Sequence, residues 1–279
     1  MKSSSWIFGF LLSVLLLPVS ATAQINVLGG LRFEHNVEPG GMYEGKIQVH
    51  NPTDEVQEVR VYKVDYLFFA DHTSKYEAPG TMARSNAPWV TLKPERMTIP
   101  PDAVVEVGYT ITMPTGPAAD TLDGVYWSLV LVEPIPKTSP ESAFSTSDTL
   151  GTPEERLKTT FTTTTRFGIQ LITQFPGTGL VDLHLANPQV VDSTAGRILT
   201  IDAENTGEQL VRTTVWVECY DATGALVGTF EGRGGGMYPG ASRRFRIDIS
   251  ALPKGVYKAL VVVDAGNDNV FGTQLDLVL

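Results

Sequence analysis

The sequence is poor in the two residue types that most often hold metals or cross-link exported chains. Its single cysteine, Cys219, allows no intramolecular disulfide and no thiolate metal centre. This residue lies in the alternating run VRTTVWVECYD, which predicts a buried structural thiol. The four histidines lack the one-face spacing of metal sites, and they are His35, His50, His72 and His184. We therefore expect no metal site and no cofactor.

The chain also lacks an excess of positive charge. It has 21 lysine and arginine residues against 31 aspartate and glutamate residues, which gives a net charge of −10 and a pI of about 4.9. Nucleic acids and anionic membrane surfaces both bind clustered Lys and Arg. The composition therefore argues against a nucleic-acid partner and against an anionic membrane partner, and it favours a solvated acidic surface.

Motifs of common catalytic sites are missing as well. No G-x-S-x-G turn occurs, and the run GRGGG at 232–236 lacks the flanking strand and helix of a phosphate loop. The segment DAGNDN at 264–269 does not have the ligand spacing of a calcium loop. The paired carboxylates Glu154 and Glu155 lie in a polar segment that is unsuited to rigid acid–base geometry. We predict a protein that is not an enzyme and has no catalytic residues.

A long apolar run occurs at the N-terminus, from Trp6 to Leu17. Lys2 precedes it, and the A-x-A motif that ends at Ala23 follows it, so residues 1–23 are predicted to be a cleaved signal peptide. A membrane anchor would need about 20 apolar residues, and Pro18 interrupts this run too early. No later segment approaches that length. The mature protein is expected in the periplasm, outside the cell or at the cell surface, with no membrane span.

The rest of the chain has the pattern of an all-β protein. Short alternating or apolar runs are separated by turn clusters, and nothing in the first half has a helical period. The clearest predicted strands are Tyr43 to His50, Val56 to Phe69, Val104 to Met113 and Val256 to Asp264.

The same pattern of short predicted strands and turn clusters occurs on both sides of the turn Pro176-Gly177. We expect two tandem immunoglobulin-like β-sandwich domains, at residues 24–176 and 177–279, because regularly spaced short strands with turn signals are typical of such sandwiches. The segment 137–158 is rich in Ser, Thr, Pro and Glu and is predicted to be a mobile loop in the first domain. The strands on either side of this loop are expected to be antiparallel neighbours.

The run from Thr159 to Phe175, TTFTTTTRFGIQLITQF, has the longest alternation in the chain. Its odd positions carry most of the large apolar residues, its even positions are polar, and Ile172 alone departs from the pattern. The alternation predicts one long, half-buried strand that joins the two domains. With its single apolar face it would serve as a core strand, and its threonine row at 160–164 would be either a solvent face or an edge that pairs with another chain.

Two cations on predicted strands are candidates for binding a partner. Arg32 and Arg166 carry guanidinium groups, which suit a partner carboxylate. The alternative is that each is an exposed charge that contributes little beyond solubility.

The order of these segments resembles the bacterial periplasmic pilus-assembly chaperones of the PapD type. A strand with Arg32 is followed by KIQVHNPTDEVQEVRVY, then VYWSLVLVEPIP, then a variable loop and TTTTRFGIQLITQFPG. The resemblance implies that the strand after the loop is lent to an unfolded pilin, and that Arg32 and Arg166 anchor the carboxylate at the pilin C-terminus. It implies partner contacts by Phe161, Thr163, Phe167 and Ile169.

The layout is also similar to WxL-interacting surface proteins, through NPTDE early, W-V-T-L-x-P in the middle and YWSLVLVEP late. That resemblance implies paired immunoglobulin-like domains that bind peptidoglycan or another partner. The first hypothesis is therefore a chaperone or assembly partner of an exported protein subunit, acting by β-strand pairing. The second is an envelope scaffold or adhesion module that binds cell-wall glycan.

Overall fold

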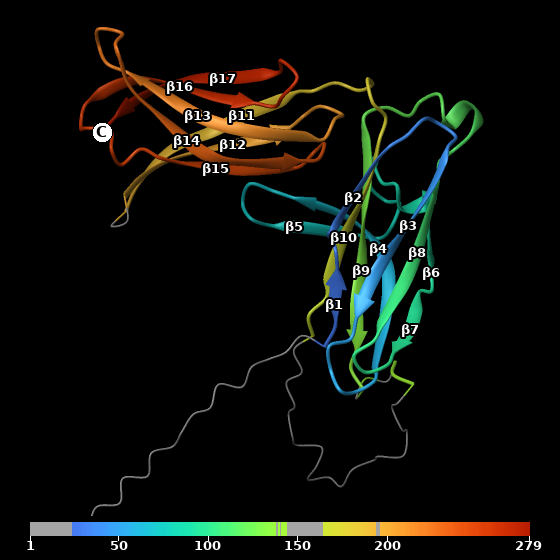
Figure 1. The fold of residues 1–279 in the computed structure, drawn as a ribbon. Coiled ribbons are helices and arrows are strands. Elements are labelled where there is room, and N and C mark those ends of the chain that lie inside the picture. Colours follow the sequence, from blue (N-terminus) through green and yellow to red (C-terminus); the bar gives the residue numbers. More distant parts are fainter. Residues whose placement is uncertain (1–23, 138, 140, 144–163, 194–195) are drawn as a thin grey trace, which may run out of the picture.

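The computed structural model describes residues 24–137, 139, 141–143, 164–193 and 196–279. It is almost entirely β-structure, arranged as two domains that meet at an angle (Figure 1). Strands β1 to β10 form the first domain, and strands β11 to β17 form the second. The predicted all-β class and the two immunoglobulin-like sandwiches are confirmed.

The first domain has two sheets. One has the order β1-β3-β8-β6, and the other has the order β2-β10-β9-β4-β5, with β7 beside β4. The bounds of the first sheet are β1 Asn26–Leu28, β3 Met42–His50, β8 Val104–Thr112 and β6 Val90–Lys93. Those of the second are β2 Arg32–Asn36, β10 Phe167–Gln174, β9 Val125–Ile135, β4 Gln57–Phe68, β5 Ser74–Glu77 and β7 Arg96–Ile99. Two short 3₁₀ turns lie between strands, at Ala87–Trp89 and Gly116–Ala118.

The core of the first domain lies between these sheets. Alternate residues of each strand enter it, as the period of two requires. From β10 the core receives Ile169 and Leu171, both fully buried. The N-terminal chain contributes to both layers, because β1 pairs with β3 in one sheet and β2 pairs with β10 in the other. Gly29, with φ of +82°, lies where the chain crosses between them.

The long predicted strand is shorter than the sequence indicated. Strand β10 begins at Phe167, so the prediction was wrong for residues 164–166, while residues 159–163 lie outside the described residues. The expected antiparallel pairing with the strand before the loop is confirmed, with Phe167 opposite Val132. Extending this register places Thr165 opposite Pro134 at a hydrogen-bonded position. Because proline has no N–H to donate there, the pairing ends.

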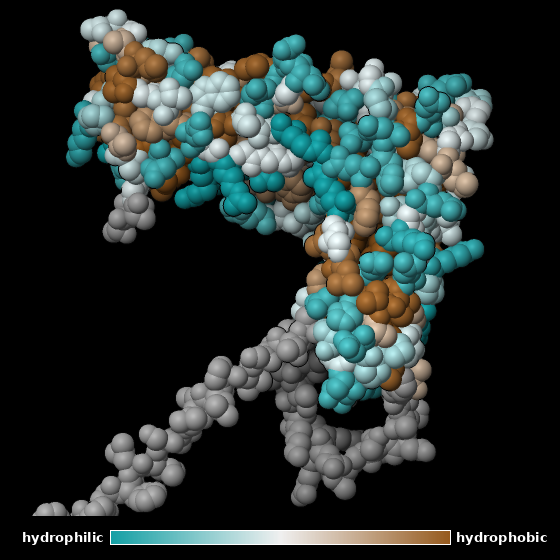
Figure 2. Space-filling view, viewed as in Figure 1, coloured by the Kyte–Doolittle hydropathy of each residue, from teal (hydrophilic) through white to brown (hydrophobic). Residues whose placement is uncertain are grey.

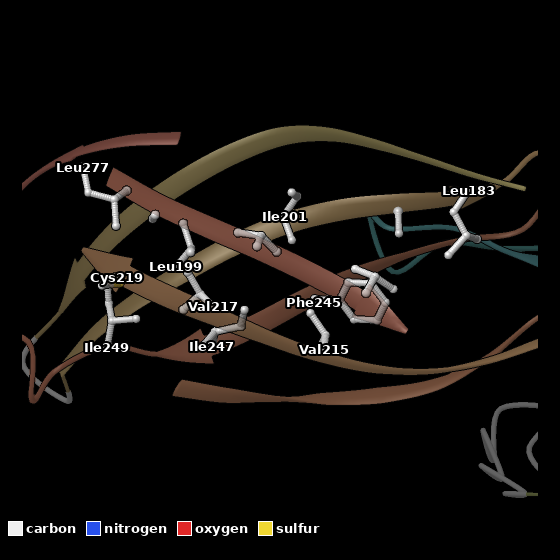
Figure 3. Packing of buried hydrophobic residues seen from close by; sticks show 14 of the residues in the cluster. Leu183, Leu199, Ile201, Val215, Val217, Cys219, Phe245, Ile247, Ile249 and Leu277 are labelled. Carbon is white, nitrogen blue, oxygen red and sulfur yellow. The ribbon is translucent and has the colours of Figure 1, made fainter. Parts of the chain in front are cut away.

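The second domain is a seven-stranded sheet in the order β11-β12-β15-β14-β13-β16-β17, folded around one core. Strand β14 pairs with β13 along most of its length and with β15 at Gly232 and Ile247. Figure 3 shows the apolar side chains gathered between the strands, with the predicted buried thiol of Cys219 among them. The bounds are β11 Leu183–Ser193, β12 Gly196–Asn205, β13 Val211–Tyr220, β14 Leu226–Met237, β15 Ser242–Asp248, β16 Val256–Asp264 and β17 Val270–Val278.

Both domains contain the same buried asparagine turn. The Asn51 side-chain amide donates to the carbonyls of Glu55 and Ile99, and the Asn205 amide donates to those of Gln209 and Met237. Each side chain therefore ties a turn to a neighbouring strand and satisfies buried carbonyls. The presence of the same buried asparagine turn in both domains indicates that they share one architecture.

Three sequence predictions fall wholly or largely on residues that the structure does not describe. These are the signal peptide at 1–23, most of the loop at 137–158, and the two candidate contact residues Phe161 and Thr163.

Candidate partner-binding cleft

One edge of strand β10 is only partly paired. Strand β9 pairs with it from Phe167 to Gln174, whereas β2 pairs with it only from Gln170 onward. Within the described part of the chain, no strand lies against the other edge of residues 167–169. A short open edge therefore precedes the start of β2.

The backbone hydrogen bonds of β10 show which of its N–H and C=O groups face this open edge. Phe175 N–H donates to the Gly124 carbonyl of the segment that leads into β9, and Gln170 N–H donates to the Leu31 carbonyl on the opposite side. In an antiparallel pair the direction of the backbone groups alternates with each residue. The N–H and C=O of Gly168 therefore point to the open edge, on the same side as those of Gln170.

The side chains predicted to contact a partner on this strand have different positions. Ile169 is fully buried in the first-domain core, and Phe167 packs against that core while partly exposed. At residues 167–169 the strand thus presents backbone groups to the edge rather than a row of large apolar side chains.

Beside the start of β2, the two domains enclose a pocket of about 370 Å³. Figure 2 shows the concave angle at which the two domains on either side of this pocket meet. Its walls come from both domains: Arg32, Tyr66, Phe68, Gln170, Leu210, Gly236, Tyr238 and Arg243. Two of these residues are arginines and none is acidic, so the pocket favours an anionic group.

Arg243 reaches the pocket from β15 of the second domain. Its guanidinium lies 5.5 Å from the centre of the Phe68 ring, and its Nη2 donates to the Gly236 carbonyl over 3.3 Å. Its Nε is buried and has no hydrogen-bond partner among the described residues. A buried donor without an acceptor is costly, so this group is suited to receive an acceptor from a ligand.

Arg32 reaches the same pocket from β2 and is held by an acidic neighbour. Glu34 forms an ion pair with Arg32 and another with Arg212 of the second domain, and it accepts a hydrogen bond from Gln174 Nε2 at 2.9 Å. Burial opposes ionisation of Glu34, but hydrogen bonds and charge from Arg212 and Arg32 outweigh it and lower the pKa of the carboxyl. Glu34 therefore stays ionised and occupies part of the hydrogen-bonding capacity of Arg32.

An apolar cluster joins the domains next to the pocket. The rings of Trp127 and Tyr238 stack 4.5 Å apart with an interplanar angle of 12°. Ile172 packs in this cluster and is fully buried, which explains why it departs from the polar face of its strand. Burial raises the pKa of the Tyr238 hydroxyl, which donates to Gln170 Oε1. The cluster thus holds the second domain against the polar face of β10.

Further polar contacts hold the two domains together at this junction. Arg84 Nη2 lies 2.9 Å from Asp123 Oδ1 and 3.4 Å from Glu208 Oε1 of the second domain. The Val125 N–H donates to the Glu208 carbonyl, and the Ala70 N–H of the β4–β5 connection donates to Ser242 Oγ. Contacts at several separate points define one arrangement of the two domains.

The structure does not place the two predicted cations side by side in this pocket. Arg166 lies just before β10, with its guanidinium 5.6 Å from the centre of the Tyr76 ring on β5. The Tyr76 ring lies 5.3 Å from that of Tyr66, which lines the pocket. In the pocket Arg32 is accompanied by Arg243, and Arg166 lies further along the same face.

Sequence reasoning missed the second-domain residues of this site. Arg243 lies in SRRFRI, where two adjacent arginines precede the alternating residues Phe245, Arg246 and Ile247. Arg212 lies in the alternating run that contains Cys219. Alternation places Arg212 off the core, whereas Arg243 shares the face of the buried Phe245 and Ile247. Neither pattern shows that these side chains face the other domain. The adjacent pair Arg243-Arg244 was the one feature of the sequence that indicated a cationic site in this domain.

No group of three or more His, Cys, Asp or Glu side chains is placed to hold a metal ion in the part of the chain that the structure describes. Across the same residues, no helix has the length and apolar character needed to cross a membrane.

No protein-family model matches the chain, and no curated protein matches its sequence. Solved structures similar to it include fimbrial chaperones, the kind of protein that the sequence resembles. The class 5 fimbriae chaperone CfaA is 12% identical, with 91% of this chain and 99% of CfaA covered and a TM-score of 0.45. The E. coli chaperone DraB is 13% identical, with 91% and 98% covered and a TM-score of 0.41.

A third similar structure is the CsuC–CsuE chaperone–tip adhesion subunit complex of Acinetobacter baumannii. It is 12% identical, with 91% of this chain and 98% of the matched chain covered and a TM-score of 0.41. At such identities and TM-scores, these matches assign no partner and no activity to this chain.

Proposed function

We propose that this chain is an exported protein that binds another exported polypeptide by adding a strand to β10, as an assembly chaperone or assembly partner of surface subunits. The observation that carries the proposal is the open edge at Gly168, which leads directly to the arginine-lined pocket between the domains. An exposed edge with unpaired N–H and C=O groups is a template for an incoming strand.

The direction of the incoming strand follows from β2. Strand β2 is parallel to β10 and begins at Arg32, opposite Gln170. A partner strand that occupies the open edge in the same direction ends where β2 begins. Its C-terminal carboxylate then lies beside Arg32 and Arg243 at the pocket.

Charge supports this placement. Arg32 and Arg243 line the pocket, and the Glu34 carboxylate beside it is paired with Arg32 and with Arg212 of the second domain. A terminal carboxylate would supply acceptors to the unpaired Arg243 Nε and to Arg32, as charge-assisted hydrogen bonds. Because the chain as a whole is acidic, an anionic chain end would be attracted to this cationic pocket more than to the rest of the surface.

The earlier part of the partner strand would pass Phe167 and Arg166. Arg166 lies four residues before Gln170, so about 13 Å separates the two positions along an extended strand. Its guanidinium, held over Tyr76, is therefore suited to contact the body of the partner rather than its terminal carboxylate.

Co-expression with surface or fimbrial subunits encoded beside its gene tests this proposal. We expect a subunit to co-purify with the wild-type protein, and we expect capture to fall about tenfold or more in Arg32→Ala and Arg243→Ala. Arg246→Ala is the matched control, because Arg246 lies on the exposed face of the same strand. Arg166→Ala is included to measure the contact before the open edge.

Two results would contradict a role as an assembly chaperone or assembly partner. One is that no neighbouring subunit co-purifies with the wild-type protein. The other is that Arg32→Ala and Arg243→Ala capture a subunit as well as Arg246→Ala does, which would show that the pocket takes no part.

A second candidate function is binding of cell-wall glycan, and one observation favours it. The second domain has a hollow of about 460 Å³ on its outer face, with Trp216 and Glu231 opposite each other in neighbouring strands and Thr229 beside them. An aromatic ring flanked by a carboxylate and a hydroxyl offers stacking and hydrogen bonds to a sugar. Sedimentation with purified peptidoglycan tests it: retention that Trp216→Ala abolishes supports glycan binding, and absence of sedimentation removes it.

A further inference from the structure

A different edge, far from the cleft, belongs to the last strand of the second domain. Strand β17 pairs with β16 on one side and ends the order of its sheet (Figure 1). Gly255 and Leu279 exchange both backbone hydrogen bonds, so the odd residues of β17 face β16. The N–H and C=O groups of Gly272, Gln274 and Asp276 therefore point to the free edge.

This edge lacks the features that protect the other edge strands in the described part of the chain. At the opposite end of the sheet, β11 contains Pro188 and a register shift between Ala186 and Gln189. The first-domain edge strands β1, β2, β5 and β6 have three to five residues each. Strand β17 has nine residues and no proline, and its one charge, Asp276, is paired with Lys258. A long, unprotected edge of this kind is a template for pairing with another chain.

We propose that β17 pairs with β17 of a second copy of this chain in an antiparallel, two-fold symmetric dimer. This goes beyond the proposed function, because it uses a surface apart from β10 and the pocket. When Gln274 lies opposite Gln274 of the second copy, all nine residues overlap. Every outward-facing residue then meets an outward-facing residue, as hydrogen-bonded pairs require.

The side chains fit this register. Val256, Val270 and Val278 are 66%, 59% and 79% exposed on the same face. Val256 already lies opposite Val278 in the β16–β17 pair, and the dimer places Val270 of the second copy against the other side of Val278. Asp276 lies opposite Gly272 of the second copy, so no like charges meet. At each end of the paired edges the dimer would thus set three valines from neighbouring strands side by side, which favours cross-strand pairing.

The register predicts the positions of cross-links. We would substitute Gln274→Cys, because the two copies of this residue lie about 5.5 Å apart across the axis in a hydrogen-bonded pair. A short thiol-to-thiol linker should then give a covalent dimer. Leu260→Cys is the matched control, because Leu260 is opposite Gln274 on β16 and its copies lie about 14 Å apart, three strand spacings. The native Cys219 is buried and stays unreactive.

Sedimentation equilibrium of the purified protein gives the second readout. We expect a concentration-dependent dimer that Gln274→Lys weakens roughly fivefold by like-charge repulsion at the axis, while Gln274→Thr leaves it unchanged. Circular dichroism would establish that both variants are folded. A monomer at every concentration overturns the proposal, and so does a dimer that Gln274→Cys fails to cross-link or that Gln274→Lys leaves intact.

Discussion

The Tyr238 hydroxyl of the second domain donates a hydrogen bond to Gln170 Oε1 of β10 over 2.8 Å. Gln170 is also the residue at which β2 begins to pair with β10, opposite Arg32. One side chain therefore connects the domain junction, the end of the open edge and the arginine-lined pocket.

The first prediction concerns the contribution of this hydrogen bond to the free energy of unfolding. Tyr238→Phe removes the hydroxyl but keeps the ring that stacks on Trp127. We expect the free energy of unfolding to fall by about 1 kcal/mol, because Gln170 loses one partially buried hydrogen bond. Tyr238→Ala should cost about 3 kcal/mol or more, because it also leaves a cavity in the cluster between the domains. Urea unfolding measures both values, and equal losses would contradict a packing role for the ring.

A second prediction concerns Gly124, which lies against the second domain. Its φ is +60°, and an added Cβ would lie 2.1 Å from the Glu208 carbonyl oxygen. Gly124→Ala must therefore displace the Glu208 backbone, and we expect a loss well above 2 kcal/mol. Gly177→Ala is the control: it has a similar φ of +74° with nothing near its Cβ position, so it should cost only about 1–2 kcal/mol. Equal losses in thermal unfolding would show that the domain contact is not tight at Gly124.

A third prediction concerns pH and His35 of β2. The ring stacks on Tyr43 with centroids 3.9 Å apart and shares a hydrogen bond with the Tyr109 hydroxyl, and burial lowers the pKa of His35. A lowered pKa means that the unfolded chain binds the proton more readily. The contribution to stability is therefore full above the unfolded value of about 6.5 and is lost as the pH falls toward the folded value.

The measurement is the melting temperature between about pH 7.5 and pH 5.5. The wild-type protein should lose stability over this range, and His35→Gln should lose less because it has no proton to bind. Parallel curves for the two proteins would show that another group controls the acid sensitivity.

A fourth prediction concerns Glu34, which holds Arg32 from within the chain. If a partner carboxylate competes with Glu34 for Arg32, then Glu34→Gln should strengthen partner binding. We expect roughly fivefold, which corresponds to about 1 kcal/mol for a partly exposed ion pair. Glu44→Gln, on β3 of the other sheet, is the control. Weaker binding by Glu34→Gln would instead indicate that Glu34 orients Arg32 for the partner.

The alternation in the sequence was sufficient to predict the fold class, most strand positions and the pairing of β9 with β10. It also identified the face of β10 that carries Gln170, Ile172 and Gln174. What covers that face was not predictable, because it depends on how the second domain packs through Trp127 and Tyr238. The buried Ile172 was the one local sign of that contact.

The start of β10 shows that the alternation of one segment does not predict where its pairing with a neighbouring strand ends. The threonine row continues the alternation before Phe167, yet residues 164–166 are not in the strand. The reason lies in its partner, where Pro134 removes the donor opposite Thr165. The pocket itself was not predicted. The sequence named Arg32 as a candidate cation on a strand, whereas Arg243 lines the pocket only through the packing of the two domains.

The most direct test of strand addition follows the Gly168 amide. The probe is a synthetic peptide with the C-terminal sequence of a subunit encoded beside the gene, made with a free carboxylate and, separately, as the C-terminal amide. By NMR, the free-acid peptide should protect the Gly168 N–H from hydrogen exchange and shift the Arg243 Nε–H, and the amidated peptide should bind about tenfold more weakly. Binding that leaves the Gly168 N–H unprotected, or that is equal for both peptides, would contradict the account.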